Sequence, residues 1–115
     1  MRNRVKAFGY AMNGVMLSWR KTFHFRVHIV IATANVLLGF ILSITPWQWC
    51  IIIICIGGVV ALEGVNTSIE VLCDRVHPEQ HQSIKAVKDI AAGAVLLFAI
   101  ATLACGLVIF APYFY

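Results

Sequence analysis

The sequence has little charge. Asp, Glu, Lys and Arg make up 12% of its 115 residues, against about 25% in a typical soluble domain. Apolar residues account for 61%, and the mean hydropathy is +0.87. This shortage of charge excludes a disordered tail and an ordinary soluble enzyme, and it argues against nucleic-acid binding although the pI is near 9.1. The length fits one domain, so we expect residues 1–115 to form a single small integral membrane domain.

The sequence also lacks the loops that most nucleotide-binding proteins use to hold phosphate. It contains no G-x-x-x-x-G-K-S/T motif and no kinase-type glycine-rich loop, so any nucleotide has to be held by helices and side chains. The four cysteines show no C-x-x-C spacing and predict neither a disulfide framework nor a zinc site. We interpret Cys50, Cys55, Cys73 and Cys105 as small packing residues.

Acidic residues are absent from the first 62 positions, and charge of either sign occurs only in residues 1–26 and 63–89. A helix needs about 20 apolar residues to cross the hydrocarbon core of a membrane. The first uncharged stretch is long enough for two short spans, and Thr45-Pro46 divides it. The expected spans are 27–44, 47–65 and 87–110, with residues 66–86 as a cytoplasmic loop and helix ends. The sequence thus predicts an all-α membrane protein with three transmembrane helices.

The distribution of positive charge predicts the orientation of these spans. Three spans place residues 1–26 and the 66–86 segment on the same side. Eight of the nine Lys and Arg residues lie in these segments, and the ninth, Lys88, lies at the membrane boundary on that side. Because positive residues accumulate on the cytoplasmic side, we expect the N-terminus to be cytoplasmic and the C-terminus to be outside. Trp47, Trp49, Tyr113 and Tyr115 then fall where an outer aromatic belt is expected.

The first 26 residues predict an amphipathic helix that lies in the inner headgroup layer. One helical face carries Val5, Phe8, Met12, Val15 and Trp19, spaced at steps of three and four residues. Two interpretations remain open for the opposite face. It could anchor the chain electrostatically to anionic lipid, which the residues alone favour, or Lys6 and Tyr10 could face a polyanionic ligand.

Glu63 is the unusual acidic residue, because it follows the apolar run 51–62 without a break. With Trp47 at the outer interface, Glu63 lies about 24 Å deeper, just inside the cytoplasmic edge of a core about 30 Å thick. A carboxylate at that depth predicts a functional role. A helix end whose acids simply leave the membrane is the alternative, and it explains Glu70 and Asp74 better than Glu63.

Helical geometry places Glu63, Glu70 and Asp74 within about 40° of one another, with Asn66 on the flank. This polar strip begins in hydrocarbon and ends in water, as a site joining a lipid headgroup to a soluble substrate requires. The buried carboxylate would suit a general base, and the exposed ones would suit a divalent cation.

The segment after the strip predicts the start of another helix. Pro78 and Glu79 are typical of a first helical turn, and a polar face then continues from His81 to Lys88 and Asp89. We expect Lys88 to bind phosphate and Asp89 to position it. The alternative is a pair of snorkelling charges, worth little where it is exposed.

Residues 61–70 resemble the signature E-x-x-N-S/T-x-I-E of the prokaryotic diacylglycerol kinase family, which includes undecaprenol kinases. The resemblance covers nearly the whole chain with the same three-span layout. It continues at Lys6 to Tyr10, Trp19, Phe25 to His28, Asp74, His81, Lys85 to Asp89 and Ala91 to Val95.

The resemblance implies a homotrimer in the bacterial inner membrane that transfers the γ-phosphoryl group of ATP, with Mg²⁺, to a lipid hydroxyl. The product would be phosphatidic acid from diacylglycerol, or undecaprenyl phosphate from undecaprenol. By motif position Glu63 would be the catalytic base and Glu70 the metal ligand. The nucleotide contacts would be Lys6, Tyr10, Asn66, Glu70, Glu79, Gln80, His81, Lys88 and Asp89. The lipid contacts would be Phe25, Arg26, His28 and Glu63.

Thr22 departs from the family pattern, which has a second metal-binding acid at this position. No acid nearby compensates, so two interpretations stay open: a working kinase with an unusual metal shell, or a weak or inactive relative that acts as a membrane binding protein. A small multidrug-type transporter is a weaker alternative, since the first span carries no carboxylate. The sequence gives no physical reason to choose between the two lipids, although residues 89–96 and 106–115 look slightly more like the undecaprenol kinases.

Overall fold

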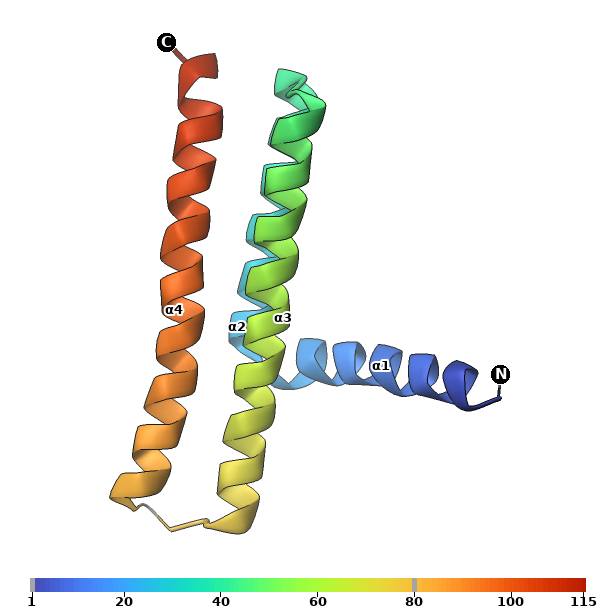
Figure 1. The fold of residues 1–115 in the computed structure, drawn as a ribbon, viewed down its shortest axis with the longest axis vertical. Helices are drawn as coiled ribbons and strands as arrows, with labels where there is room; N and C mark the ends of the chain where they lie inside the picture. The colour runs from blue at the N-terminus through green and yellow to red at the C-terminus, as the bar shows by residue number, and fades with distance from the viewer. Residues whose placement is uncertain (1, 80) are drawn as a thin grey trace.

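The computed structural model describes residues 2–79 and 81–115 and shows a chain built from helices (Figure 1). No strand occurs in this described part, and the all-α prediction is confirmed. Its elements are α1 (Arg2–Lys21), α2 (Phe23–Leu42), α3 (Pro46–Val76), α4 (Gln82–Phe110) and the 3₁₀ helix η1 (Ala111–Tyr113).

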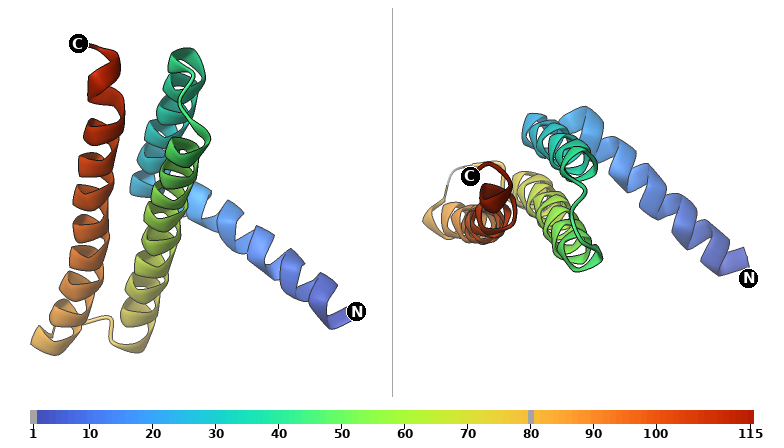
Figure 2. Two further views of the ribbon diagram at one scale, coloured as in Figure 1. Left: turned by 45° about the horizontal axis from the view of Figure 1, so that its top comes forward. Right: turned by 90° about the horizontal axis from the view of Figure 1, so that it is seen from above.

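Within the described residues, α2, α3 and α4 are long and apolar enough to cross a membrane, as predicted. They lie side by side, and α3 packs against both α4 and α2 (Figures 1 and 2). α3 has 31 residues and is therefore about 46 Å long, more than a core of about 30 Å requires. Residues 66–76, expected within a loop and helix ends, continue α3 without a break. The polar strip therefore stands on one rigid rod.

The prediction that Pro78 begins the last helix is wrong. α4 begins at Gln82, and His81 is its N-cap residue. The His81 Nδ1 atom accepts a hydrogen bond from the Ser83 amide at 3.1 Å. A side-chain acceptor satisfies one of the free amides of a first helical turn, and Pro78 offers none.

The junction between α1 and α2 also differs from the prediction. The expected interfacial segment through residue 26 is too long, because Thr22 has an extended backbone (φ −120°, ψ 115°) and residues 23–26 already belong to α2. α1 leaves the bundle crosswise (Figure 2). Its apolar residues, such as Val5 and Phe8, are exposed. This arrangement suits a helix that rests on a membrane surface, which stays a prediction.

Arg26 links the end of α1 to the start of α2 through hydrogen bonds. Its Nε donates to the Trp19 carbonyl at 2.6 Å, and Nη2 donates to the Arg20 carbonyl at 2.9 Å. The guanidinium carbon also lies 5.9 Å from the centre of a Trp19 ring. The last carbonyls of a helix have no partner within the helix, so a cation there satisfies them and favours the helix dipole. Arg26 thereby fixes the end of α1 to the start of α2.

The turn between α2 and α3 confirms the break predicted at Thr45-Pro46. Thr45 caps α3: its Oγ1 accepts from the Gln48 amide at 3.3 Å, and the Gln48 side chain accepts from the Thr45 amide at 3.0 Å. The Tyr113 hydroxyl donates to the same Gln48 oxygen at 2.7 Å. This end of the bundle also holds an apolar cluster, made of Ile44, Ile52, Ile109 and Phe110.

Two glycines set the spacing between helices. A Cβ atom at Gly58 would overlap the Phe98 ring of α4, and one at Gly39 would lie 2.8 Å from the Trp49 ring of α3. Gly57, beside Gly58, has open space at the same position. Small residues at helix contacts allow close approach in membranes, and here one glycine of the 57–58 pair has that role.

We predict that Gly58→Ala lowers the stability of the folded protein by about 1–3 kcal/mol, because the added methyl forces Phe98 out of its place. Gly57→Ala is the matched control and should have little effect. Unfolding in mixed micelles with increasing SDS measures both. Equal loss in the two variants would show that Phe98 does not set the α3–α4 distance.

We also predict that Arg26→Met loosens the end of α1. Methionine keeps an unbranched stem and removes the donors, each of which contributes about 1.5–3 kcal/mol when charged. Amide hydrogen exchange in the last turn of α1 should rise about tenfold or more. Arg20→Gln is the control, since no hydrogen bond of the Arg20 side chain occurs in the described structure. Unchanged exchange in Arg26→Met would contradict the role of this contact.

Candidate functional site

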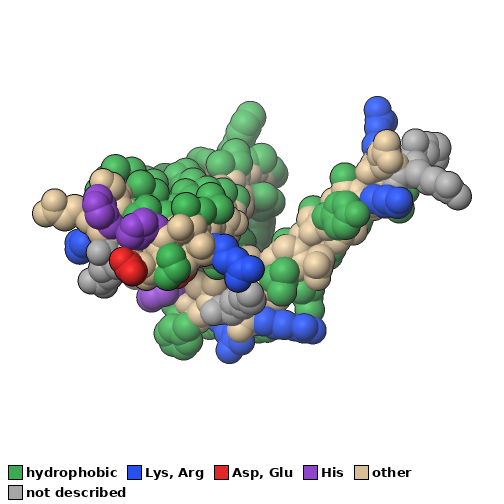
Figure 3. Space-filling model, turned by 90° about the horizontal axis from the view of Figure 1, so that it is seen from below, with side chains coloured by type: hydrophobic (Ala, Val, Ile, Leu, Met, Phe, Trp, Pro, Cys, Tyr) green, Lys and Arg blue, Asp and Glu red, His purple; other side chains and the backbone are tan. Residues whose placement is uncertain are grey.

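The polar strip of α3 contains two buried polar residues. Glu63 is 5% exposed and Asn66 is 7% exposed, whereas Glu70 and Asp74 are exposed. Because α3 is continuous, the strip leads from the packed part of the bundle to its charged end. Figure 3 shows that end, where acidic, basic and histidine side chains gather. The predicted gradient from a buried carboxylate to exposed ones is present.

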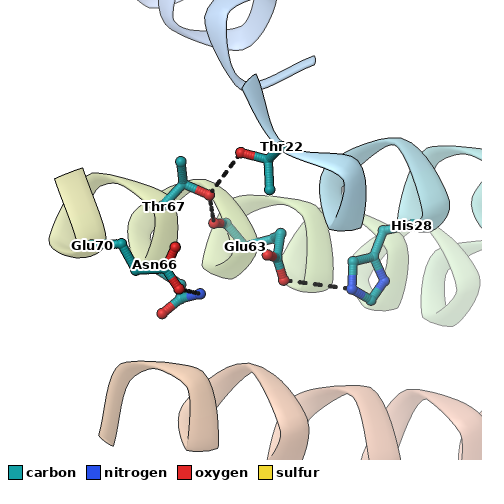
Figure 4. A network of polar contacts seen from close by, with 6 residues as sticks. All are labelled: Thr22, His28, Glu63, Asn66, Thr67 and Glu70. Atoms are coloured by element: carbon teal, nitrogen blue, oxygen red, sulfur yellow. Dashed lines mark hydrogen bonds and ion pairs between the residues drawn. The ribbon is translucent and has the colours of Figure 1, made fainter. Parts of the chain in front are cut away.

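The Glu63 carboxylate points toward α2, where its Oε2 lies 3.5 Å from His28 Nε2 (Figure 4). The Glu63 side chain is 6% exposed and the His28 side chain 22%. Besides Glu63, the expected lipid contacts were Phe25, Arg26 and His28. Phe25 is buried, and the Arg26 side chain donates hydrogen bonds to carbonyls of α1. His28 is therefore the member of that set that the structure brings to Glu63.

Asn66 and Glu70 form the next contact along the strip. Asn66 Nδ2 donates to Glu70 Oε1 at 3.3 Å, one turn apart on α3. The Asn66 Oδ1 atom is buried and has no hydrogen-bond partner among the described residues. A buried acceptor without a partner is costly, so this oxygen is available to a donor or a cation that the protein itself does not supply.

Thr67 was missed in the sequence analysis. Its Oγ1 donates to the Glu63 carbonyl at 3.0 Å and lies 3.3 Å from Thr22 Oγ1. Thr67 and Asn66 lie on the two flanks of the strip, on either side of Glu63, because adjacent helical positions are about 100° apart (Figure 4). The same helical projection that found Asn66 could have found Thr67 on the other flank. Thr22 thus lies at the edge of the strip through its contact with Thr67.

Lys88 reaches the strip from α4. Its Nζ pairs with the Asp74 carboxylate, whereas Asp89 pairs with Lys85 of its own helix at 2.7 Å. Both pairs are exposed enough that they add little stability. The structure therefore brings Lys88 to the acidic strip and does not bring Asp89 to it. Both roles in phosphate binding stay predictions.

The remaining predicted nucleotide contacts are spread over two regions. Glu79 and His81 lie in the connection between α3 and α4, with Glu79 exposed and His81 capping α4. Gln80 lies outside the described residues. Lys6 and Tyr10 are exposed on the part of α1 that projects from the bundle (Figures 1 and 3). A single chain does not bring these two to the strip.

The oxygen atoms of Glu70 and Asn66 suit a magnesium site that the protein completes only in part. Among the described residues no three His, Cys, Asp or Glu side chains are grouped for a metal, which argues against a cage made entirely of protein. Mg²⁺ commonly uses one or two carboxylates and completes its shell with phosphate oxygens and water. Glu70 and the unpartnered Asn66 oxygen suit that arrangement, because both offer oxygen ligands beside each other.

A groove of about 360 Å³ runs between α2, α3 and α4. Its lining is mostly apolar, and its polar members include His28, Asn35 and Thr102. Glu63 is not among the lining residues, although Val59 and Val60 are. His28 is therefore the lining residue that also contacts the buried carboxylate.

The sequence is similar to known lipid kinases. Residues 9–110 match the family described as prokaryotic diacylglycerol kinase. The undecaprenol kinase of Bacillus subtilis is 38% identical over 107 residues, covering 93% of this chain and 87% of that protein. The diacylglycerol kinase of Synechocystis is 32% identical over 105 residues, covering 90% of this chain and 60% of that protein. The diacylglycerol kinase of Escherichia coli is 28% identical over 93 residues, covering 81% and 76%.

Proposed function

The chain belongs to the prokaryotic diacylglycerol kinase family, and we propose that it transfers the γ-phosphoryl group of ATP to the hydroxyl of a membrane lipid. The reaction would take place at the cytoplasmic face of a bacterial inner membrane. The observation that carries this proposal is the burial of Glu63 at one end of a strip that becomes exposed at Glu70. A lipid substrate approaches such a strip from the membrane, and a nucleotide approaches it from water.

Glu63 would act as the general base. Its carboxylate takes the hydroxyl proton as the lipid oxygen bonds to the γ-phosphorus and the bond from that phosphorus to ADP breaks. Phosphoryl transfer depends mainly on positioning and on neutralising charge, so helices and side chains suffice. Burial supports this role, because a carboxylate that is only 5% exposed in an apolar helix is expected to have a function.

Glu70 and Asn66 would hold the phosphate end of the nucleotide together with Mg²⁺. When bound, the ion would neutralise charge on the β- and γ-phosphates. Asn66 keeps the Glu70 carboxylate in place through its amide, and Lys88 contributes positive charge from α4. Glu79, Gln80, His81 and Asp89 remain proposed nucleotide contacts.

Lys6 and Tyr10 would reach the nucleotide only in an assembly. They lie on the exposed, projecting part of α1, so a homotrimer in which α1 of one copy approaches another copy would bring them closer. We keep the homotrimer as part of this proposal. We also keep the cytoplasmic N-terminus and the outer C-terminus in this proposal, because the distribution of Lys and Arg favours that orientation.

Undecaprenol is the substrate that we would test first, with diacylglycerol second. The undecaprenol kinase of Bacillus subtilis shares 38% of aligned residues with this chain, more than the diacylglycerol kinases at 32% and 28%. A weak or inactive binding protein is the second candidate, because Thr22 supplies no carboxylate. Parallel assays with both lipids distinguish these possibilities.

We predict that Glu63→Gln lowers turnover by about 10²–10⁴-fold, the usual contribution of a general base. Purified protein in lipid vesicles should transfer labelled phosphate from ATP to a lipid alcohol, and the variant should bind ATP with unchanged affinity. Glu63→Asp, which shortens the side chain by one methylene, should retain part of the activity. An active Glu63→Gln protein would remove Glu63 from the chemistry, and an inert wild type with both lipids would refute the kinase proposal.

We predict that Thr22→Glu reduces the Mg²⁺ concentration for half-maximal activity by about tenfold, equivalent to about 1.4 kcal/mol of added attraction. Thr22 lies at the edge of the strip through its contact with Thr67, so a carboxylate there adds negative charge near Glu70. Thr22→Gln is the control of equal size without charge. If only Thr22→Glu is active and the wild type is inert, the chain is a weak or inactive relative.

A further inference from the structure

His28 stands between the groove and the buried carboxylate. It lines the groove formed by α2, α3 and α4, and its Nε2 lies 3.5 Å from Glu63 Oε2. Resting on the proposed kinase function, we propose that His28 is a second proton-handling residue: it receives from Glu63 the proton of the lipid hydroxyl and releases it to water.

The geometry supports direct exchange between these two groups. A distance of 3.5 Å is an ion-pair contact, slightly longer than a good N–H···O hydrogen bond. Catalytic hydrogen bonds are often long without substrate and shorten when it binds. No backbone break separates either residue from its helix, so a small movement of the side chains is enough to close the distance.

The difference in burial between the two side chains favours proton transfer from Glu63 to His28. The Glu63 side chain is 6% exposed and the His28 side chain is 22% exposed. A proton left on Glu63 would block the next turnover unless it could leave, and the dry surroundings of Glu63 hinder its departure to water. His28 is the more exposed group, and imidazole is the side chain that by itself changes charge between pH 5 and 8.

The neighbouring charged groups have other partners. On α2, Arg26 is bound to the α1 carbonyls, and His24 is exposed. On α3, Glu70 lies about two turns from Glu63 and accepts a hydrogen bond from Asn66. On α4, the charged residues Lys85, Lys88 and Asp89 occur in ion pairs, Lys88 with Asp74 of α3. Among the side chains that the structure describes, no other ionic contact to Glu63 or His28 occurs.

The step balances as follows. The lipid O–H bond breaks as its oxygen bonds to phosphorus, ADP leaves, and Glu63 becomes a neutral carboxylic acid. Neutral His28 with its ring hydrogen on Nδ1 accepts this proton at Nε2, which restores the Glu63 carboxylate beside an imidazolium that donates to it. Loss of that proton to water restores neutral His28, so each turnover releases one proton in total.

A merely positioning role would require only a hydrogen-bond donor at the place of Nε2. Glutamine provides such a donor at a similar reach and cannot carry a proton near neutral pH. His28→Gln therefore separates holding Glu63 in place from accepting its proton. His24→Gln is the matched control, because His24 is an exposed histidine one turn earlier on the same helix.

The experiment measures kcat and KM for the lipid in vesicles between pH 5 and 9, for the wild type, His28→Gln and His24→Gln. We expect His28→Gln to lower kcat at least tenfold with KM changed less than threefold. The wild-type kcat should fall toward the acid end of this range, and this fall should be absent in His28→Gln. His24→Gln should behave as the wild type. A His28→Gln enzyme with wild-type kcat and the same pH profile would overturn the proposal.

A second variant covers the case in which His28→Gln does not assemble normally. His28→Ala opens space beside the groove, and added imidazole should restore part of kcat in proportion to its uncharged form. A folded His28→Ala protein whose activity imidazole does not change would also overturn the proposal. A wild type that phosphorylates neither lipid would instead be a failure of the kinase function.

Discussion

The proposed site depends on a carboxylate held away from water near the charged end of a long apolar helix. A buried ionised group is unfavourable unless it is paired, hydrogen-bonded or neutralised. Glu63 meets this constraint through His28 alone among the described ion pairs, and the contact is loose at 3.5 Å. The site is therefore not a rigid structural salt bridge. A proton or a substrate hydroxyl can change its charge balance, which is what a general base requires.

The helices hold the Glu63 carboxylate in a fixed position relative to its neighbours on α3. α3 is one uninterrupted helix from the aromatic end to the charged end, so Glu63, Asn66 and Glu70 keep fixed relative positions. Gly58 lets α4 approach α3, and Arg26 fixes α1 to α2. Helices α2 and α4 both pack on α3, and the groove between all three leads to His28. Rigid helices thus place the groups of the proposed site, which would need no phosphate-binding loop.

The sequence predicted the three long helices, the break at Thr45-Pro46 and the burial of Glu63, because hydrophobic runs and charge positions reflect the membrane directly. It did not predict the contacts between helices. His28 and Glu63 are 35 positions apart, and periodicity within one helix says nothing of how two helices are rotated against each other. The start of α4 was misplaced because Pro78 is typical of a first helical turn, whereas the actual N-cap, His81, is not one of the residue types usually found there. The α1–α2 break at Thr22 had no glycine or proline to mark it.

Thr22 has a physical consequence beyond the loss of a metal ligand. A glutamate there would add a third carboxylate close to Glu63 and Glu70, and like charges in a poorly solvated site repel one another until a cation binds. Threonine avoids this repulsion and lies 3.3 Å from the Thr67 hydroxyl. In the proposed kinase, the site would therefore carry less repulsion before a cation binds, and its attraction for a divalent cation would be weaker. The phosphates of the nucleotide would then supply more of the cation's ligands, so metal and nucleotide should bind together rather than one after the other.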